Sequence, residues 1–162
     1  MFPMFPMLSR SSSLRVLGFA LLGCVGITGC HPIRIAPPPG FAVLEPGEDY
    51  SYRAVSPQGV VLTVRREKNE PEGDLGFWSG AIDAKLRRDG YRAYEAHDVV
   101  SKGVKGKQVR YAIERDQREH TYWVTVFVTS SAVITVEAGG DHELFAREGE
   151  AVGRSIATLD VD

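Results

Sequence analysis

Three groups of polar residues carry the side chains that acid–base or metal chemistry requires. Asp141-His142-Glu143 places two carboxylates beside an imidazole at the expected start of a helix, while His97-Asp98 and His120 lie near the ends of predicted strands. Consecutive helical residues point in different directions, so the first group favours a helix cap with acids in its first turn. The two histidines could share a site only on neighbouring strands, and a divalent metal needs three or four ligands. We expect surface histidines and no metal.

A serine hydrolase is the enzyme class that the remaining residue types could supply. Ser130-Ser131 lies in a predicted hairpin turn, whereas a G-x-S-x-G nucleophile sits on a strand-to-helix elbow, and the chain has no such motif. Ser79-Gly80 is expected on the exposed side of a helix. The sequence reveals no convergent nucleophile and base, so we expect no enzyme activity and no cofactor.

Lys102, Lys105, Lys107 and Arg110 concentrate positive charge on a glycine-containing hairpin. This patch could contact anionic lipid headgroups or an acidic partner, because each charge near a membrane surface contributes up to about 1 kcal/mol. The alternative, which we favour, is a solvated turn. Five aromatic residues could likewise line a ligand groove, although their spacing favours a place in the core: Trp78, Tyr91, Tyr94, Tyr111 and Trp123.

The N-terminal region has the order of a secretory signal peptide, with Arg10 and Arg15 ahead of an apolar run over residues 16–27. This run is too short to span a bilayer, which takes about 20 residues. Ile27-Thr28-Gly29-Cys30 follows it, and this order resembles the lipobox of bacterial lipoproteins. The resemblance implies diacylglycerol on the Cys30 sulfur, cleavage before Cys30 and acylation of the new amino terminus.

Two alternatives remain for this region: an ordinary signal peptide cut elsewhere, and lipidation at Cys24 within Leu22-Gly23-Cys24, which would leave a very short apolar core. We predict Cys30 as the lipidated residue. Each buried methylene contributes about 0.8 kcal/mol, so two or more acyl chains hold a protein firmly in its bilayer. His31 follows Cys30 and no Asp suggests inner-membrane retention, which favours the outer membrane by enteric sorting rules. The domain is then expected in the periplasm or at the cell surface.

Composition limits the mature protein to one domain without thiol chemistry. Removal of residues 1–29 leaves 133 residues, with 17 basic and 21 acidic side chains and a net charge of −4. This acidity gives no sign of a nucleic-acid partner. Cys24 leaves with the signal and Cys30 carries lipid, so no thiolate or disulfide remains. Residues 30–40 contain a proline triplet and predict a polyproline spacer of roughly 30 Å, ahead of a single domain over residues 41–162.

Hydrophobic periodicity predicts a mixed fold after the spacer. The helix at 74–89 has Asp74 as its N-cap and Gly90 as its stop. A second helix follows Asp141, and its Gly149 and Gly153 are expected to allow close packing on a sheet. The connections after residue 90 are too short for parallel crossovers, so the strands there form an antiparallel meander. The expected strands are 50–54, 60–64, 91–100, 108–115, 120–129 and 132–138, with a short apolar segment at 41–44 and a polar loop at 67–73. Strand 120–129 has apolar side chains on both faces and is expected to be central.

The order of these elements, behind a lipobox and a proline-rich segment, resembles the PsbP-like fold. The best-known members of that family are accessory subunits of the photosystem II oxygen-evolving complex, and small bacterial lipoproteins share the fold. The resemblance implies an α+β domain with an antiparallel sheet flanked by two helices, in an α/β/α sandwich, and a non-enzymatic binding or assembly factor.

We therefore expect a lipoprotein anchored in a membrane of the bacterial cell envelope, with an envelope protein as its partner. The alternatives are a carrier of a small apolar ligand held between sheet and helix, and a hydrolase.

Overall fold

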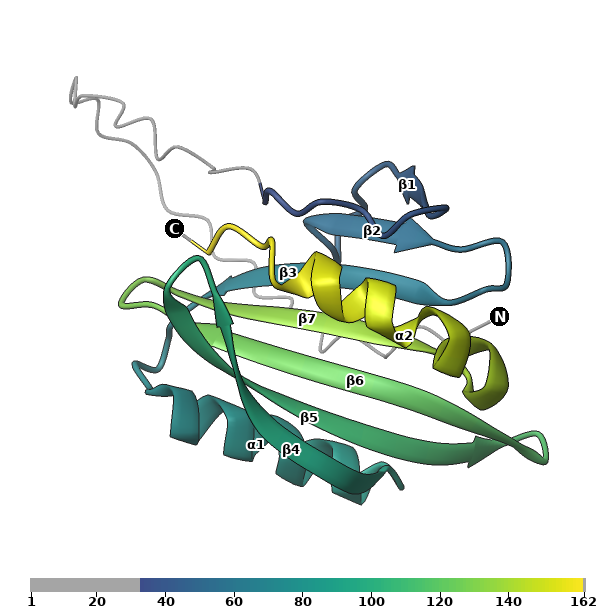
Figure 1. Ribbon diagram of the computed structural model, residues 1–162. Helices are drawn as coiled ribbons and strands as arrows, with labels where there is room; N and C mark the ends of the chain where they lie inside the picture. The colour runs from purple at the N-terminus through teal and green to yellow at the C-terminus, as the bar shows by residue number, and fades with distance from the viewer. Residues whose placement is uncertain (1–32, 162) are drawn as a thin grey trace, which may run out of the picture. The chain divides into compact units, whose positions relative to one another are not determined.

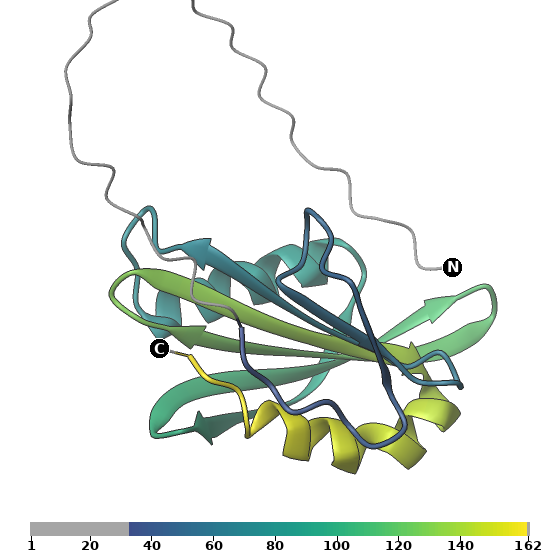
Figure 2. The same cartoon turned by 90° about the horizontal axis from the view of Figure 1, so that it is seen from above.

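The computed structural model describes residues 33–161, so Cys30 and the predicted signal peptide lie outside the described residues. Within them, the strands form one antiparallel sheet in the order β1-β2-β3-β7-β6-β5-β4 (Figure 1). One helix covers each face of this sheet, as the view from above shows (Figure 2). The predicted α+β class and the α/β/α sandwich are confirmed. The elements are β1 Ala42–Leu44, β2 Tyr52–Val55, β3 Val61–Lys68, α1 Leu75–Arg88, β4 Arg92–Ser101, β5 Val104–Arg115, β6 Arg118–Val128, β7 Ala132–Asp141 and α2 His142–Ile156.

Both helices begin at the aspartates that the sequence indicates. The Asp74 carboxylate accepts a hydrogen bond from the amide of Phe77 at 2.7 Å, and Asp141 accepts from the amide of Glu143 at 3.1 Å. These bonds satisfy amides that have no partner inside the helix. At the other end of α1, Gly90 takes a φ of +91°, which glycine adopts without penalty. The helix bounds are therefore fixed by local sequence.

Strand β6 is the central strand with two covered faces, as predicted. Its Val124 and Val126 pack under α1, while Trp123 and Phe127 pack under α2. The α2 face forms the larger apolar cluster, and the Trp123 ring meets the Phe145 ring edge-on at 4.8 Å. Each face of the sheet thus has its own core.

Two predicted strand boundaries are wrong. Strand β3 continues through Lys68 because residues up to its end pair with β7, where Lys68 lies opposite Ala132. The β4–β5 turn consists of Lys102-Gly103, so the glycine at position 106 belongs to a strand instead of a flexible loop. A Cβ atom on Gly106 would lie 2.5 Å from the Phe127 ring, which explains why a glycine occupies this strand position.

The predicted spacer is also wrong over the part that the structure describes. Residues 33–41, here called the N-terminal strap, pack on the α2 face, with Ile33, Ile35 and Phe41 against the core. The Ala36 amide donates to Thr158 Oγ1 at 2.9 Å, and the carbonyl of Arg34 accepts from the Asp160 amide at 2.8 Å. The packed body therefore starts at Ile33, and the proline residues at 37–39 lie against the domain instead of separating it from the membrane.

Candidate binding groove

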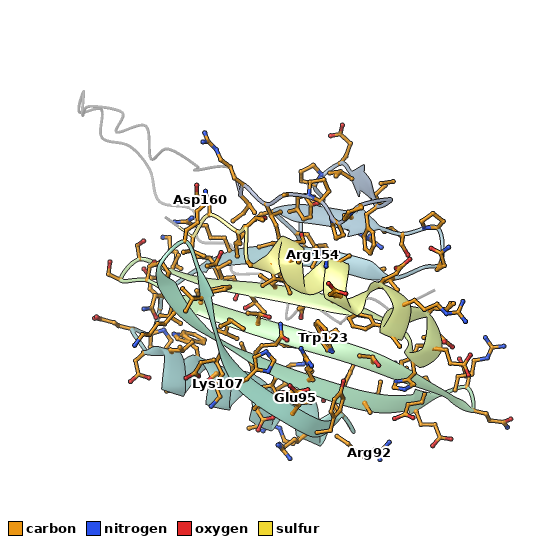
Figure 3. The ribbon with its side chains drawn as sticks, viewed as in Figure 1. Arg92, Glu95, Lys107, Trp123, Arg154 and Asp160 are labelled. Atoms are coloured by element: carbon orange, nitrogen blue, oxygen red, sulfur yellow. The ribbon has the colours of Figure 1, made fainter. Side chains whose placement is uncertain are left out.

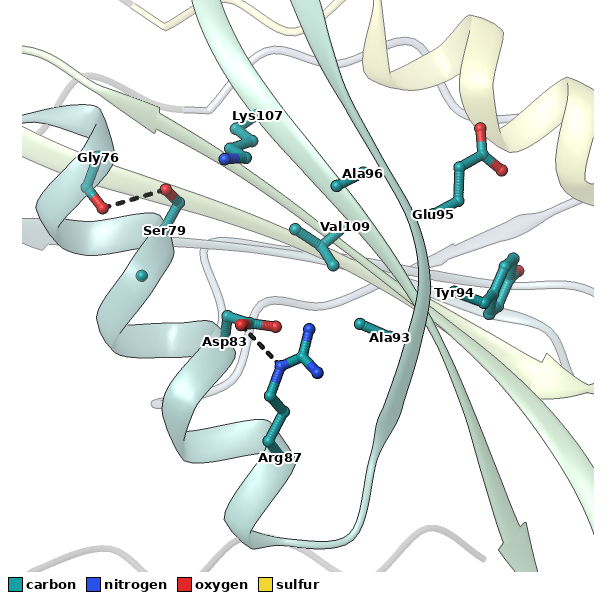
Figure 4. A pocket seen from close by; sticks show the side chains of 11 residues that line it. Gly76, Ser79, Asp83, Arg87, Ala93, Tyr94, Glu95, Ala96, Lys107 and Val109 are labelled. Atoms are coloured by element: carbon teal, nitrogen blue, oxygen red, sulfur yellow. Dashed lines mark hydrogen bonds and ion pairs between the residues drawn. The ribbon is translucent and has the colours of Figure 1, made fainter.

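An open groove of about 430 Å³ runs between α1 and strand β4 (Figure 4). Small residues of both elements leave this space: Gly76, Ser79 and Gly80 on the helix, and Ala93 and Ala96 on the strand. The helix packs on β5 and β6, so β4 extends beyond its cover. A bulge between Ala93 and Glu95 turns Tyr94 outward, where its side chain is 56% exposed. The groove is therefore a shallow channel beside the edge of the sheet.

Charged side chains form the walls of the groove. Asp83 on α1 accepts from Arg87 Nε at 2.8 Å and from the hydroxyl of Tyr111 at 2.9 Å. Burial, together with the hydrogen bond and the negative charge of Asp83, raises the pKa of Tyr111, so its phenol stays a neutral donor. Lys107 of β5 also lines the groove and forms no ion pair with any described residue. Lys107 thus contributes a cation to the groove, with Asp98 opposite it in the β4–β5 ladder.

Among residues 33–161, strand β4 is the outer strand on this side of the sheet and pairs with β5 alone. No described strand pairs with the other backbone edge of its ten residues. Exposed edges of this kind are templates for pairing with another extended chain. Val100, at the far end of β4, is 58% exposed. The groove and the free edge together form a surface suited to an extended peptide.

The predicted basic patch does not form one surface. Arg110 lies on the α2 face, where it stacks on the Trp123 ring at 4.1 Å and pairs with Glu95 at 2.7 Å. Lys107 and Val109 instead line the groove under α1, as alternation along a strand requires. Lys102 pairs with Asp160 at 3.0 Å, close to the end of the chain (Figure 3). Lys105 is exposed beside the turn.

The histidines do not converge. His97 is on β4 and His120 on β6, with β5 between them, and their partners on β5 are five residues apart. His97 lies 3.3 Å from Glu95, and His142 Nδ1 lies 2.9 Å from Thr121 Oγ1. Among residues 33–161, no three potential metal ligands gather in one place. The Asp141-His142-Glu143 group serves as the start of α2.

The serines have structural roles, and one prediction about them is wrong. Ser79 lies on the buried side of α1, not on its exposed side. Its hydroxyl donates to the Gly76 carbonyl at 3.3 Å. Ser131 lies in the β6–β7 turn, where its carbonyl accepts from the Asn69 amide at 3.2 Å. Thr121, the hydroxyl residue that contacts an imidazole, is 4% exposed, so a substrate could not reach it. Its contact with His142 ties the start of α2 to the sheet.

Asp83 and Arg87 lie four residues apart on α1, a spacing that by itself indicates a helical ion pair and no groove. The signal was present in two parts: three small residues along one flank of α1, and Ala93 and Ala96 on β4, three positions apart across the bulge. Neither part indicates a groove until the register of β4 against β5 is known. Of the five aromatic residues, Tyr94 alone is exposed at the groove, and Tyr111 forms its inner support.

No protein-family model matches the chain, and no curated protein matches its sequence. Solved structures do resemble it. LpqN of Mycobacterium tuberculosis, described as involved in cell envelope biogenesis, superposes with a TM-score of 0.66 at 12% identity over 78% of this chain and 82% of that one.

Two further structures have the same arrangement. CyanoP, the PsbP protein of the cyanobacterium Synechocystis, superposes with a TM-score of 0.53 at 10% identity, over 87% of this chain and 99% of its own. A protein of Bacteroides thetaiotaomicron superposes with a TM-score of 0.53 at 16% identity. The match covers 81% of this chain and 45% of that longer protein. Among residues 33–161 no helix is long and apolar enough to cross a membrane. The likenesses show that the chain has the fold shared by LpqN and the PsbP-like proteins.

Proposed function

We propose that the protein is a lipoprotein of the bacterial cell envelope, anchored through Cys30, which binds an extended segment of an envelope protein and is not an enzyme. The observation that carries this proposal is the free edge of β4 beside the groove. An extended segment added to a sheet edge gains main-chain hydrogen bonds, and alternate side chains enter the neighbouring pocket.

Charge indicates the kind of segment that fits. Lys107 lines the groove without an ion-pair partner among the described residues, so an acidic side chain of the bound segment would neutralise it. Gly, Ala and Ser residues line the channel together with Val109, and the shallow space they leave favours small side chains on the bound segment. An open groove with charged walls suits a peptide better than an apolar ligand.

Two further observations support a binding role in the envelope. Ser79, Thr121 with His142, and Asp141, which the sequence offers for chemistry, form hydrogen bonds inside α1, between α2 and the sheet, and at the start of α2. LpqN, which has this fold, is described as involved in cell envelope biogenesis. Cys30 would supply the membrane attachment.

Site-specific photocrosslinking in cells tests the proposal. A photoreactive residue replaces Tyr94 on the β4 edge, and a second variant carries it at Val43 on the opposite edge, where the side chain is 53% exposed. We expect one protein crosslinked from position 94 and not from position 43. The recovery should fall when Cys30→Ala removes the anchor.

Charge reversal provides the second half of this test. Lys107→Glu should lower the crosslinked yield about tenfold, which corresponds to about 1.4 kcal/mol of binding free energy. Arg118→Glu, at an exposed position on β6, is the matched control and should leave the yield unchanged. Equal yields from both edges, or full yield from Lys107→Glu, would contradict the proposed site.

A further inference from the structure

We infer that one corner of the domain rests directly on the surface of the bilayer. This anchor corner comprises Arg34, Val100, Lys102, Gly103 and Lys105, at the start of the strap and at the β4–β5 turn. The inference rests on the proposed lipidation of Cys30 and adds the orientation of the domain, which the proposed function leaves open.

The length of chain between the lipid and the packed body carries the argument. Ile33 already packs against the core, and only three peptide bonds separate it from Cys30. A fully extended chain spans at most about 3.6 Å per residue, so the sulfur-bearing residue lies within about 11 Å of Ile33. A domain on so short a linker cannot present an arbitrary side to the membrane. The side of the domain next to Ile33 must face the membrane.

Hydrogen bonds identify which other residues share that side. Arg34 forms an isolated bridge with Asp160, and Asp160 pairs with Lys102 at the β4–β5 turn. The hydroxyl of Ser101 donates to the carbonyls of Ala157 at 3.0 Å and Leu159 at 2.7 Å. These contacts hold the strap, the last residues of the chain and the hairpin tip together at one end of the sheet (Figure 1). Arg92, at the start of β4, lies at the opposite end (Figure 3).

The exposed groups of this corner suit an anionic lipid surface. Arg34, Lys102 and Lys105 are all exposed, and among the described residues of the corner Asp160 supplies the carboxylate that pairs with Lys102. Val100 lies opposite Lys105 in the ladder and presents an exposed apolar side chain beside its charge. The carboxylates of the β3–α1 loop lie at the same end of the sheet, at the start of α1, whereas the strap packs on the α2 face. Basic groups next to an apolar side chain are the combination that a headgroup region attracts.

This orientation also places the groove. Strand β4 runs away from the corner over ten residues, which corresponds to about 30 Å of rise. The groove residues Tyr94 and Ala96 then lie toward the far end of β4 from the bilayer. A partner segment paired with the β4 edge would run at a steep angle to the membrane plane. Its binding site would lie within the length of β4 above the headgroups.

Depth-dependent quenching on the acylated full-length mature protein tests the inference. The protein is reconstituted into vesicles of phosphatidylcholine and phosphatidylglycerol, with a spin label on the headgroups of a fraction of the lipids. Cys30 is blocked by its lipid, so a fluorophore can be attached to a single new thiol, Lys105→Cys at the corner or Arg118→Cys at the far end of the sheet. We expect quenching at position 105 to exceed that at position 118 severalfold.

The outcomes separate this inference from the proposed function. Equal quenching at the two positions, or stronger quenching at 118, would overturn the orientation, while flotation and the acylated mass would still support the anchor. A protein that carries no lipid on Cys30 and does not float with vesicles would overturn both. Repeating the measurement with a label at Val100→Cys guards against a local effect of the lysine substitution and should give the same strong quenching.

Discussion

Tyr111 and Tyr122 are buried phenols that donate to carboxylates, Tyr111 to Asp83 at 2.9 Å and Tyr122 to Glu137 at 2.7 Å. Burial first, and the neighbouring carboxylates second, raise the pKa of both phenols above the ordinary value of 10. Above pH 10 the unfolded chain therefore loses these protons while the folded chain keeps them. The folded state then binds more protons than the unfolded state, so stability falls as the pH rises.

We predict that the free energy of unfolding decreases above pH 10 by up to about 1.4 kcal/mol per pH unit for each such phenol. Urea denaturation at pH 9 and at pH 11 measures the loss. Tyr111→Phe has no proton to lose at this position, so its loss between the two pH values should be smaller than that of the wild type. Identical losses would show that the Tyr111 phenol does not resist ionisation.

Gly149 and Gly153 differ, although the sequence suggested one reason for both. A Cβ atom at Gly149 would lie 3.3 Å from the Trp123 ring, so the expected close packing is confirmed there. At Gly153 a Cβ atom would meet nothing within 4 Å, and the expectation is wrong. Gly153→Ala should therefore raise the free energy of unfolding by up to about 1 kcal/mol, the difference in helix propensity.

Gly149→Ala should stabilise the protein less than Gly153→Ala, because the new methyl group pushes against Trp123 and offsets the gain in helix propensity. Urea denaturation of the two variants at neutral pH compares them on the same helix. An equal gain in stability from both substitutions would mean that α2 does not pack as tightly on β6 as the structure shows.

The strap is the element whose role changed most between sequence and structure. Its contacts with Thr158 and Asp160 predict that the Ala36 amide is protected from hydrogen exchange. Thr158→Val keeps the shape of the side chain but removes the hydroxyl that accepts this amide. We expect Ala36 exchange to accelerate about fivefold, as for a net loss of roughly 1 kcal/mol per hydrogen bond.

NMR measures the hydrogen exchange of each amide separately, so the amides of β6 serve as the control for Ala36. The amides of β6 lie in the centre of the sheet and should exchange as in the wild type. Unchanged exchange at Ala36 would show that the strap does not depend on this contact with the end of the chain.

The elements that the sequence predicted well are those with local signals. Asp74 and Asp141 mark helix starts because capping needs only a side chain and the next three residues. The end of β3 was missed because its polar residues are strand only through pairing with β7, which is remote in sequence. The turn before β5 was misplaced because Gly103 and Gly106 look alike in sequence, and only the Phe127 ring distinguishes them.

At the scale of the whole molecule, the sheet order and the site could not be read from the sequence. The groove requires α1 to stop short of β4, a result of how the helix packs on β5 and β6. The strap was read as a spacer because Pro37-Pro38-Pro39 favours an extended chain, and that conformation also suits a segment lying flat on a surface. Its partners lie about 120 residues later, beyond the reach of any local pattern.

The contacts between the first and last described segments determine when the strap can dock during synthesis. Arg34 and Ala36 find their hydrogen-bond partners in residues 155–160, so these contacts cannot form until nearly the whole polypeptide has been synthesised. A chain delivered across a membrane with its amino end first would complete this contact as its last step. Until then the strap remains undocked. If Cys30 is lipidated as we propose, the processing enzymes could act before the strap packs against the body.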